Sequence, residues 1–345
     1  MPARAPAPFK PSATELTLLN AWQHGFPLVR EPFAQMAQAL QLSEAQVLQT
    51  LQSLLDRGAI SRVGGVFAPG AGGAALLAAM AVPDDRLESV AALVSACPGV
   101  NHNYQREHRF NLWFVMTGRD APAVEAAMRM LERATGLPAL RLRMQRAYRI
   151  DLGFDLRHAT APVPMRAHKA QRAPAIAPQD RALAACVEQG LGIEARPFDA
   201  WADQCHSTSE AILQRLHQWL EGGTLKRFGV VVRHHELGFA ANAMTVFNVP
   251  DDRVDACGEA LARQTGVTLA YRRERAEGWP FNLYCMVHGT HREAVQEVIQ
   301  RVVPAAGLGE FPSEVLFSTR RFKQTGARRF RAPAPAAEEA TDALA

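Results

Sequence analysis

The apolar positions between residues 33 and 55 recur every three or four residues, a period that predicts two short helices. Pro32 stands where the first of them begins, because a fixed φ and a missing N–H are harmless in the first helical turn. Ser43 and Gln46 have the spacing of a capping box for the second helix. Residues 59–67 then read as a hairpin strand. With a third short helix, this order predicts a winged helix-turn-helix unit.

The hydrophobic pattern changes in the next eighty residues, where short apolar runs alternate with helical ones. The strand expected last carries apolar Leu140, Leu142 and Met144 at every second position, which puts them on one face. The order β-α-β-β-α-β is that of a ferredoxin-like domain. We expect its strands at 73–83, 100–107, 110–118 and 139–151, and its helices at 86–99 and 121–136.

The whole pattern occurs twice, so the chain is a tandem duplication of a unit of about 150 residues. The matching pairs include REPF (30–33) with ARPF (195–198), AISRVGGVF (59–67) with TLKRFGVVV (224–232), VPDDR at 82–86 and 249–253, PGVNHNYQRE (98–107) with TGVTLAYRRE (265–274), and FNLWFVMTG (110–118) with FNLYCMVHG (281–289).

We therefore predict an α+β fold with two copies of a winged helix-turn-helix plus ferredoxin-like unit. The Ala- and Pro-rich stretch between the copies reads as a solvated linker, and the Ala-rich end as a disordered tail. The expected segments are winged helix-turn-helix units at 14–68 and 180–232, ferredoxin-like domains at 69–157 and 233–326, the linker at 158–179 and the tail at 331–345.

Composition excludes several classes of protein. The chain has 38 bases against 34 acids, a balance that does not mark a nucleic-acid-binding protein. Its five cysteines are scattered without a C-x-x-C pair, so we expect no metal site of its own. No stretch reaches the roughly 18 apolar residues that span a bilayer, and the N-terminus lacks the apolar core of a secretory signal. We expect a cytoplasmic protein without a membrane partner.

A winged helix joined to a ferredoxin-like domain resembles the Lrp/AsnC family of transcriptional regulators, and that resemblance implies DNA binding. The two helices that would read DNA lie at 43–58 and 207–223, and each holds a single base, Arg57 and Arg215. Affinity for duplex DNA comes largely from Lys and Arg on phosphates. We interpret both helix-turn-helix units as degenerate and expect no DNA partner.

Polar residues crowd the strand in NHNYQREHRFNLWF (101–114). Strand alternation puts His102, Tyr104, Arg106 and His108 on one face, and a shift of one residue would exchange the faces. Histidines suit proton transfer or iron binding, arginines suit carboxylates, and aromatic rings suit a flat conjugated ligand. Together, these three residue types indicate a polycarboxylated tetrapyrrole as the ligand.

The second copy differs at these positions. Tyr271 and Arg273 align with Tyr104 and Arg106, with Arg272 on the opposite face, but Leu269 replaces the first histidine. His288, in turn, aligns with a threonine of the first copy. Lrp/AsnC-type domains pair sheet to sheet with ligands between them, so two unequal covalently joined copies can build one asymmetric pocket. We expect one competent site.

The motifs HNYxREHxFNLWF and YRRxRxxGWPFNLYCMVHG resemble those of siroheme decarboxylase, so the chain looks like a natural fusion of its two subunit types. The resemblance implies removal of CO2 from the C12 and C18 acetates of siroheme, giving 12,18-didecarboxysiroheme for heme d1 or alternative heme biosynthesis. It also implies that no separate cofactor is required, since the iron belongs to the substrate. Carried over residue by residue, it assigns proton donation or orientation to His102, His108 and His288, carboxylate binding to Arg106, Arg109, Arg272 and Arg273, and further substrate contacts to Tyr104 and Tyr271.

Other interpretations remain open at this point. The chain could be a DNA-binding, heme-responsive regulator, or a tetrapyrrole carrier that releases no CO2. A strand histidine is often a hydrogen-bonded structural residue, which is the plain alternative for His102, His108 and His288. Beyond siroheme and its didecarboxylated product, the partners to consider are a second copy of the chain and neighbouring enzymes of the tetrapyrrole pathway.

Overall fold

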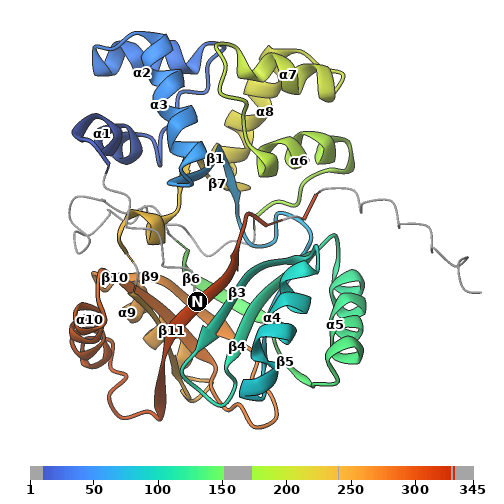
Figure 1. Ribbon diagram of the computed structural model, residues 1–345, viewed down its shortest axis with the longest axis vertical. Coiled ribbons are helices and arrows are strands. Elements are labelled where there is room, and N and C mark those ends of the chain that lie inside the picture. The colour runs from blue at the N-terminus through green and yellow to red at the C-terminus, as the bar shows by residue number, and fades with distance from the viewer. Residues whose placement is uncertain (1–10, 151–172, 240, 328, 331–345) are drawn as a thin grey trace, which may run out of the picture.

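The computed structural model describes residues 11–150, 173–239, 241–327 and 329–330, which form an upper helical layer and a lower layer of sheets and helices (Figure 1). The predicted tail at 331–345 and the first part of the predicted linker, 158–172, lie outside the described residues. The end of that stretch is not a free linker. Ile176 packs against the upper core, and its backbone N–H donates to the carbonyl of Ala71.

The upper layer holds both helix-turn-helix units, and each has three helices as expected. The Ser43 side chain accepts from the backbone N–H of Gln46, whose side chain in turn accepts from the backbone N–H of Ser43, so the predicted capping box is confirmed. The elements are α1 (Ala13–Ala21), α2 (Pro32–Leu40), α3 (Glu44–Asp56) and β1 (Ile60–Phe67) in the first unit, and α6 (Arg181–Gln189), α7 (Pro197–Gln204), α8 (Ser209–Glu221) and β7 (Leu225–Val232) in the second.

The prediction of a β-hairpin within each unit is wrong. Strands β1 and β7 pair with each other, antiparallel, with Gly64 opposite Gly229. Each unit contributes only one strand here, so its backbone groups find their partners in the other copy. A Cβ on Gly229 would lie 2.2 Å from the carbonyl oxygen of Trp22, so only glycine permits this close approach.

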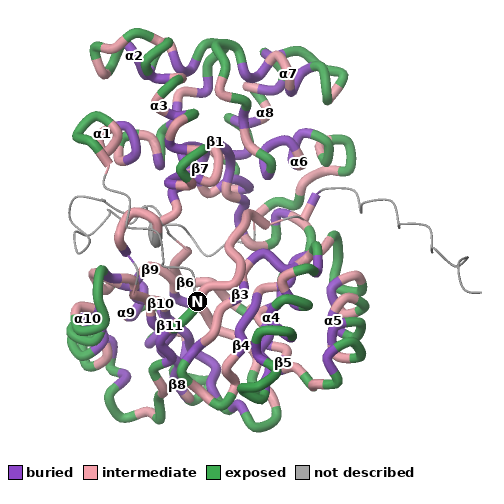
Figure 2. The backbone as a smooth tube through the Cα atoms, in the orientation of Figure 1, coloured by how far each residue is buried: buried purple, intermediate pink, exposed green. Residues whose placement is uncertain are grey.

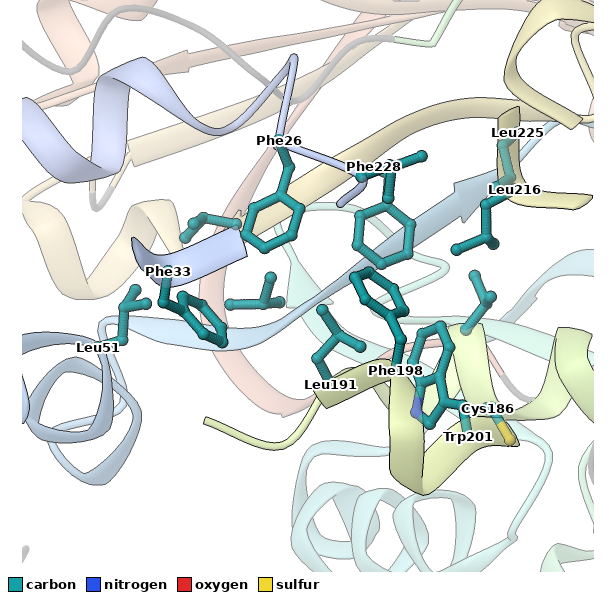
Figure 3. Close-up of a cluster of buried hydrophobic side chains, with 14 of the residues drawn as sticks. Phe26, Phe33, Leu51, Cys186, Leu191, Phe198, Trp201, Leu216, Leu225 and Phe228 are labelled. Atoms are coloured by element: carbon teal, nitrogen blue, oxygen red, sulfur yellow. The ribbon is translucent and has the colours of Figure 1, made fainter. Parts of the chain in front are cut away.

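This shared ribbon joins the two units into one core. Aromatic rings from both copies meet there, with Phe26 and Phe228 5.6 Å apart and Phe198 and Phe228 6.4 Å apart between centroids (Figure 3). The upper layer is therefore one hydrophobic unit built from both halves of the sequence.

The lower layer contains two ferredoxin-like halves, as predicted. The first half holds β2 (Ala74–Met80), η1 (Asp84–Arg86), α4 (Leu87–Ala96), β3 (Val100–Arg106), β4 (Leu112–Gly118), α5 (Ala121–Thr135), β5 (Ala139–Leu142) and β6 (Met144–Ile150). After the short η2 (Pro178–Asp180) and η3 (His234–Leu237), the second half holds β8 (Ala241–Phe247), α9 (Val254–Ala262), β9 (Val267–Arg273), β10 (Leu283–Gly289), α10 (Arg292–Ala305) and β11 (Ser313–Gln324).

The strands follow the order β5-β2-β4-β3-β11-β8-β10-β9-β6. The last strand of each copy bends from its own sheet to the other. Residues 313–317 of β11 pair with β8, whereas residues 318–324 pair with β3. The single strand expected at 139–151 is likewise divided at Arg143 into β5, which pairs with β2, and β6, which pairs with β9 of the other copy.

Helices α4 and α5 cover the outer face of one sheet, and α9 and α10 cover the outer face of the other. Figure 2 shows exposed segments on these helices and mostly buried or intermediate positions along the strands between them. One buried cluster combines inner-face residues of both copies, among them Trp113 and Leu142 of the first and Trp279, Tyr284 and Leu316 of the second. The predicted sheet-to-sheet pairing is therefore present within a single chain.

Candidate functional site

The polar residues of β3 lie on its inner face. The side chain of Asn103 points the other way and donates to the carbonyl of Ala91 in α4, at 3.1 Å. Strand alternation then directs His102, Tyr104 and Arg106 toward the second sheet. The imidazole of His102 and the ring of Tyr104 are 6.2 Å apart between centroids.

Arg106 links the two copies. Its side chain is buried, with 6% of the residue exposed, and its Nη1 donates to the carbonyl of Leu316 in β11 at 2.9 Å. Its Nη2 lies 4.0 Å from the Sδ of Met286 in β10. Burial lowers the pKa of the Arg106 guanidinium to about 10. The residue remains a cation at neutral pH, directed at the strand that carries His288.

His288 lies two positions beyond Met286 on the same inner face of β10. One of its ring nitrogens, Nδ1, is 2.9 Å from the hydroxyl of Thr268. Burial, with a further contribution from the Arg106 charge, lowers the pKa of His288 to about 4. We call His102, Tyr104, Arg106, Met286 and His288 the inner cluster.

His102 has the same character as His288. Burial lowers its pKa to about 4, and its Nδ1 is 3.2 Å from the side-chain oxygen of Asn101. Both imidazoles are therefore neutral at pH 7. Both nevertheless keep part of their surface accessible to solvent.

The same arrangement occurs a second time, without its histidines. Arg273 in β9 lies over the ring of Tyr271, with its Cζ 5.1 Å from the centroid, and its Nη1 donates to the carbonyl of Leu142 at 2.9 Å. Burial raises the pKa of Tyr271 to about 12. Leu269 and Thr117 occupy the positions that match His102 and His288. We call Leu269, Tyr271, Arg273 and Thr117 the mirrored cluster.

Three sequence-predicted site residues lie elsewhere. His108 is not on β3, because the strand ends at Arg106 and the chain turns there, with the backbone N–H of His108 donating to the carbonyl of Arg106. The Nε2 of His108 contacts the carboxylate of Glu314 at 2.8 Å, its ring lies 5.3 Å from Trp279, and burial lowers its pKa.

Arg109 is exposed in the same turn and donates to the backbone carbonyl of Gly278. Arg272 points to the outer face of β9, where its guanidinium lies 3.2 Å from Asp251 and 3.7 Å from Asp255. Neither side chain joins the inner cluster.

The sequence patterns did not identify Arg321, a residue that lies near the inner cluster. Arg321 in the second half of β11 pairs with Tyr104 across the strands and forms an ion pair with Glu236 of η3. The matching position in the first copy is Ala147, which pairs with Tyr271. The difference between the two final strands was visible in the sequence, but which strand β11 would pair with was not.

The helices that would read DNA offer few cations. Arg57 is paired with Glu15, and Arg215 lies 3.5 Å from Asp180. Among the described residues, no group of three or more His, Cys, Asp or Glu side chains is placed to hold a metal ion, and all five cysteines are free. No helix in this described part of the chain is long and apolar enough to cross a membrane.

Comparison with known proteins gives consistent matches. The AsnC-like ligand binding domain matches residues 71–149 and 236–323, and the siroheme decarboxylase NirDL-like HTH domain matches residues 15–60. The siroheme decarboxylase NirDL subunit of Paracoccus denitrificans is 41% identical over 317 residues, which cover 91% of this chain and 96% of the relative. The siroheme decarboxylase NirD subunit of Stutzerimonas stutzeri is 51% identical over 139 residues, 40% of this chain and 91% of the relative.

A solved structure has the same architecture. The crystal structure of the siroheme decarboxylase NirDL in complex with an iron-uroporphyrin III analogue matches with a TM-score of 0.64 and 27% identity. The match covers 92% of this chain and 94% of that one.

Proposed function

Because the chain belongs to the siroheme decarboxylase family, we propose that it removes CO2 from the C12 and C18 acetate side chains of siroheme to give 12,18-didecarboxysiroheme. The observation that supports a single working site is the inner cluster, in which Arg106 of one copy approaches Met286 and His288 of the other, with His102 on the same face of β3 as Arg106. The mirrored cluster keeps the arginine and the tyrosine but lacks both imidazoles.

Each decarboxylation breaks the bond between the acetate CH2 carbon and its carboxylate carbon. CO2 leaves, the electron pair stays on the CH2 carbon in conjugation with the macrocycle, and one proton then completes a methyl group. The macrocycle serves as its own electron sink, so the protein has to supply orientation and a proton. We assign proton donation to His102 and His288, and retention of a remaining carboxylate to Arg106, whose guanidinium suits planar bidentate contacts. Arg273 belongs to the mirrored cluster and has no part in this site.

With a pKa of about 4, both His102 and His288 are neutral at pH 7 in the free protein. Neutral imidazoles are poor acids toward carbon, so a proton has to arrive before the chemical step. A bound polycarboxylate brings negative charge close to His102 and His288, and an opposite charge at short range raises the pKa of a histidine. We therefore propose that substrate binding raises the pKa of both histidines and so protonates them. The negative charge of the substrate overcomes the desolvation that keeps both imidazoles neutral in the free protein.

His108, Arg109 and Arg272 have a smaller part in this proposal. The Nε2 of His108 lies 2.8 Å from Glu314 and Arg109 donates to the carbonyl of Gly278, so both side chains already have partners within the protein. Arg272 lies on the outer face of β9. We assign to His108 a structural role, in which its contacts with Glu314 and Trp279 hold the turn after β3.

The direct test is anaerobic incubation of the full chain with siroheme, followed by mass analysis of the tetrapyrrole. We expect the loss of two molecules of CO2 from the substrate. The variant His102→Leu, which carries the residue of the mirrored cluster, should slow this loss while siroheme affinity stays within a few-fold. Tight binding of unchanged siroheme by the wild type would instead identify a carrier. Sequence-selective binding of duplex DNA without product would identify a regulator.

A further inference from the structure

We propose that Arg321, supplied by the bent end of β11, is a substrate-binding residue that holds one side-chain carboxylate of the macrocycle at the inner cluster. This inference rests on the proposed function and adds to it an anchor that is present in only one half of the molecule.

The position of Arg321 follows from strand register. The second half of β11 leaves its own sheet and pairs with β3, where Arg321 lies opposite Tyr104. Side chains of directly opposite residues in antiparallel strands project from the same face, with their Cβ atoms about 5 Å apart. Arg321 therefore shares the inner face with Tyr104, and its charge acts on the Tyr104 phenol, favouring ionisation against the effect of burial.

Two contacts orient the guanidinium. Its Nη2 pairs with the carboxylate of Glu236, and its Nη1 donates to the side-chain oxygen of Gln324 at 3.0 Å. A guanidinium has five N–H donors in a fixed plane, so these two contacts leave donors for a ligand. About a quarter of the Arg321 side chain remains exposed, at 25%, which allows a ligand carboxylate to reach it.

The strand that carries Arg321 is fixed beyond its end. The backbone N–H of Thr325 donates to the carbonyl of Asn101 at 2.7 Å. The backbone N–H groups of Arg329 and Phe330 both donate to the buried carboxylate of Glu188 in α6, at 2.9 and 3.0 Å. The helical layer thus acts as an anchor for the β11 strand, a structural use for helix-turn-helix units whose recognition helices each carry a single base.

The mirrored cluster has no equivalent of this anchor. Ala147 of β6 lies opposite Tyr271, at the place where Arg321 lies opposite Tyr104. A methyl side chain cannot bind a carboxylate. Three positions therefore carry a group able to bind or protonate substrate at the inner cluster and lack it at the mirrored cluster, as expected if one cluster alone binds substrate productively. These positions are Arg321 against Ala147, His102 against Leu269 and His288 against Thr117.

The test compares Arg321→Ala and Arg321→Lys with the neighbouring control Arg320→Ala. Arg320 is paired with Glu88 and lies over the ring of Phe322, on the opposite face of the strand. We would measure siroheme binding anaerobically by absorbance titration, and KM and kcat of decarboxylation for each full-length variant. Loss of a charge-assisted contact predicts a rise in Kd and KM of about 10-fold or more for Arg321→Ala, since such contacts contribute roughly 1.5–3 kcal/mol. The lysine variant should fall between wild type and alanine, and Arg320→Ala within about two-fold of wild type.

A second variant, at Glu236, tests the same role of Arg321 even if substitutions at position 321 impair folding. Glu236→Gln leaves the guanidinium in place but weakens its orientation, so KM should rise several-fold while kcat stays close to that of the wild type. If wild type converts siroheme and the Arg321 variants behave like Arg320→Ala, the carboxylate anchor is refuted and the proposed function stands. If wild type neither binds nor converts siroheme, the proposed function fails and the anchor fails with it.

Discussion

Two neutral, partly buried histidines should make this protein sensitive to mild acid. His102 and His288 have a pKa of about 4 in the folded chain, against a usual value of 6.5. Between these values the unfolded chain binds more protons than the folded one. Folding stability therefore rises with pH in this window, and it is lost as the pH falls below 6.5.

The size of the effect follows from the two pKa values. A difference of one pKa unit corresponds to about 1.4 kcal/mol, and the penalty is complete only below the folded pKa. At pH 5, each histidine costs about 2 kcal/mol of unfolding free energy, so the pair costs about 4 kcal/mol relative to neutral pH. That is a large part of the roughly 5–15 kcal/mol that stabilises a typical protein.

The measurement is urea unfolding at pH 7.5 and pH 5, for wild type and for the double variant His102→Leu with His288→Thr. These replacements are the residues that the mirrored cluster carries at the same positions, Leu269 and Thr117. Wild type should lose about 4 kcal/mol more than the double variant between the two pH values. The variant His217→Gln, at an exposed position of α8, is the matched control and should follow wild type. Equal losses in wild type and the double variant would refute the assignment of buried neutral imidazoles.

Three further outcomes are expected. Arg106→Ala should lower the unfolding free energy by about 1–3 kcal/mol, since the carbonyl of Leu316 loses its buried donor, and urea unfolding checks this. Siroheme binding should be accompanied by proton uptake, and its affinity should rise from pH 7.5 to pH 6, because bound carboxylates raise the pKa of His102 and His288. Calorimetry in buffers of different ionisation enthalpy measures this proton uptake. Binding without proton uptake would contradict substrate-coupled protonation. Fluorescence anisotropy with random duplex DNA should show only weak, salt-sensitive binding without sequence preference.

Much of the architecture was predictable because it rests on local patterns that the chain repeats. Period-two alternation in β3 identified the face that carries His102, Tyr104 and Arg106, and the side-chain contact of Asn103 with α4 confirms it. The same alternation separated Arg273 from Arg272, which the structure finds on opposite faces.

The errors and omissions arose where the answer depended on a partner far away in the sequence. His108 was counted with the strand because no local signal marked the end of β3 at Arg106. The β1 strand was expected to fold back within its own unit, but it pairs with β7. Arg321 was not considered, because its place beside Tyr104 exists only after β11 bends from one sheet into the other.

The sequence by itself therefore determined the duplication, the class of each unit, the alternation of faces along β3 and β9 and the histidines that distinguish one copy from the other. These features follow from side-chain periodicity and aligned motifs, which are local properties of the chain. The tertiary structure alone decided which strands of the two copies pair and which side chains meet at Arg106. Backbone donors and acceptors are the same in every strand, so the choice of partner depends on how the whole chain buries its apolar faces.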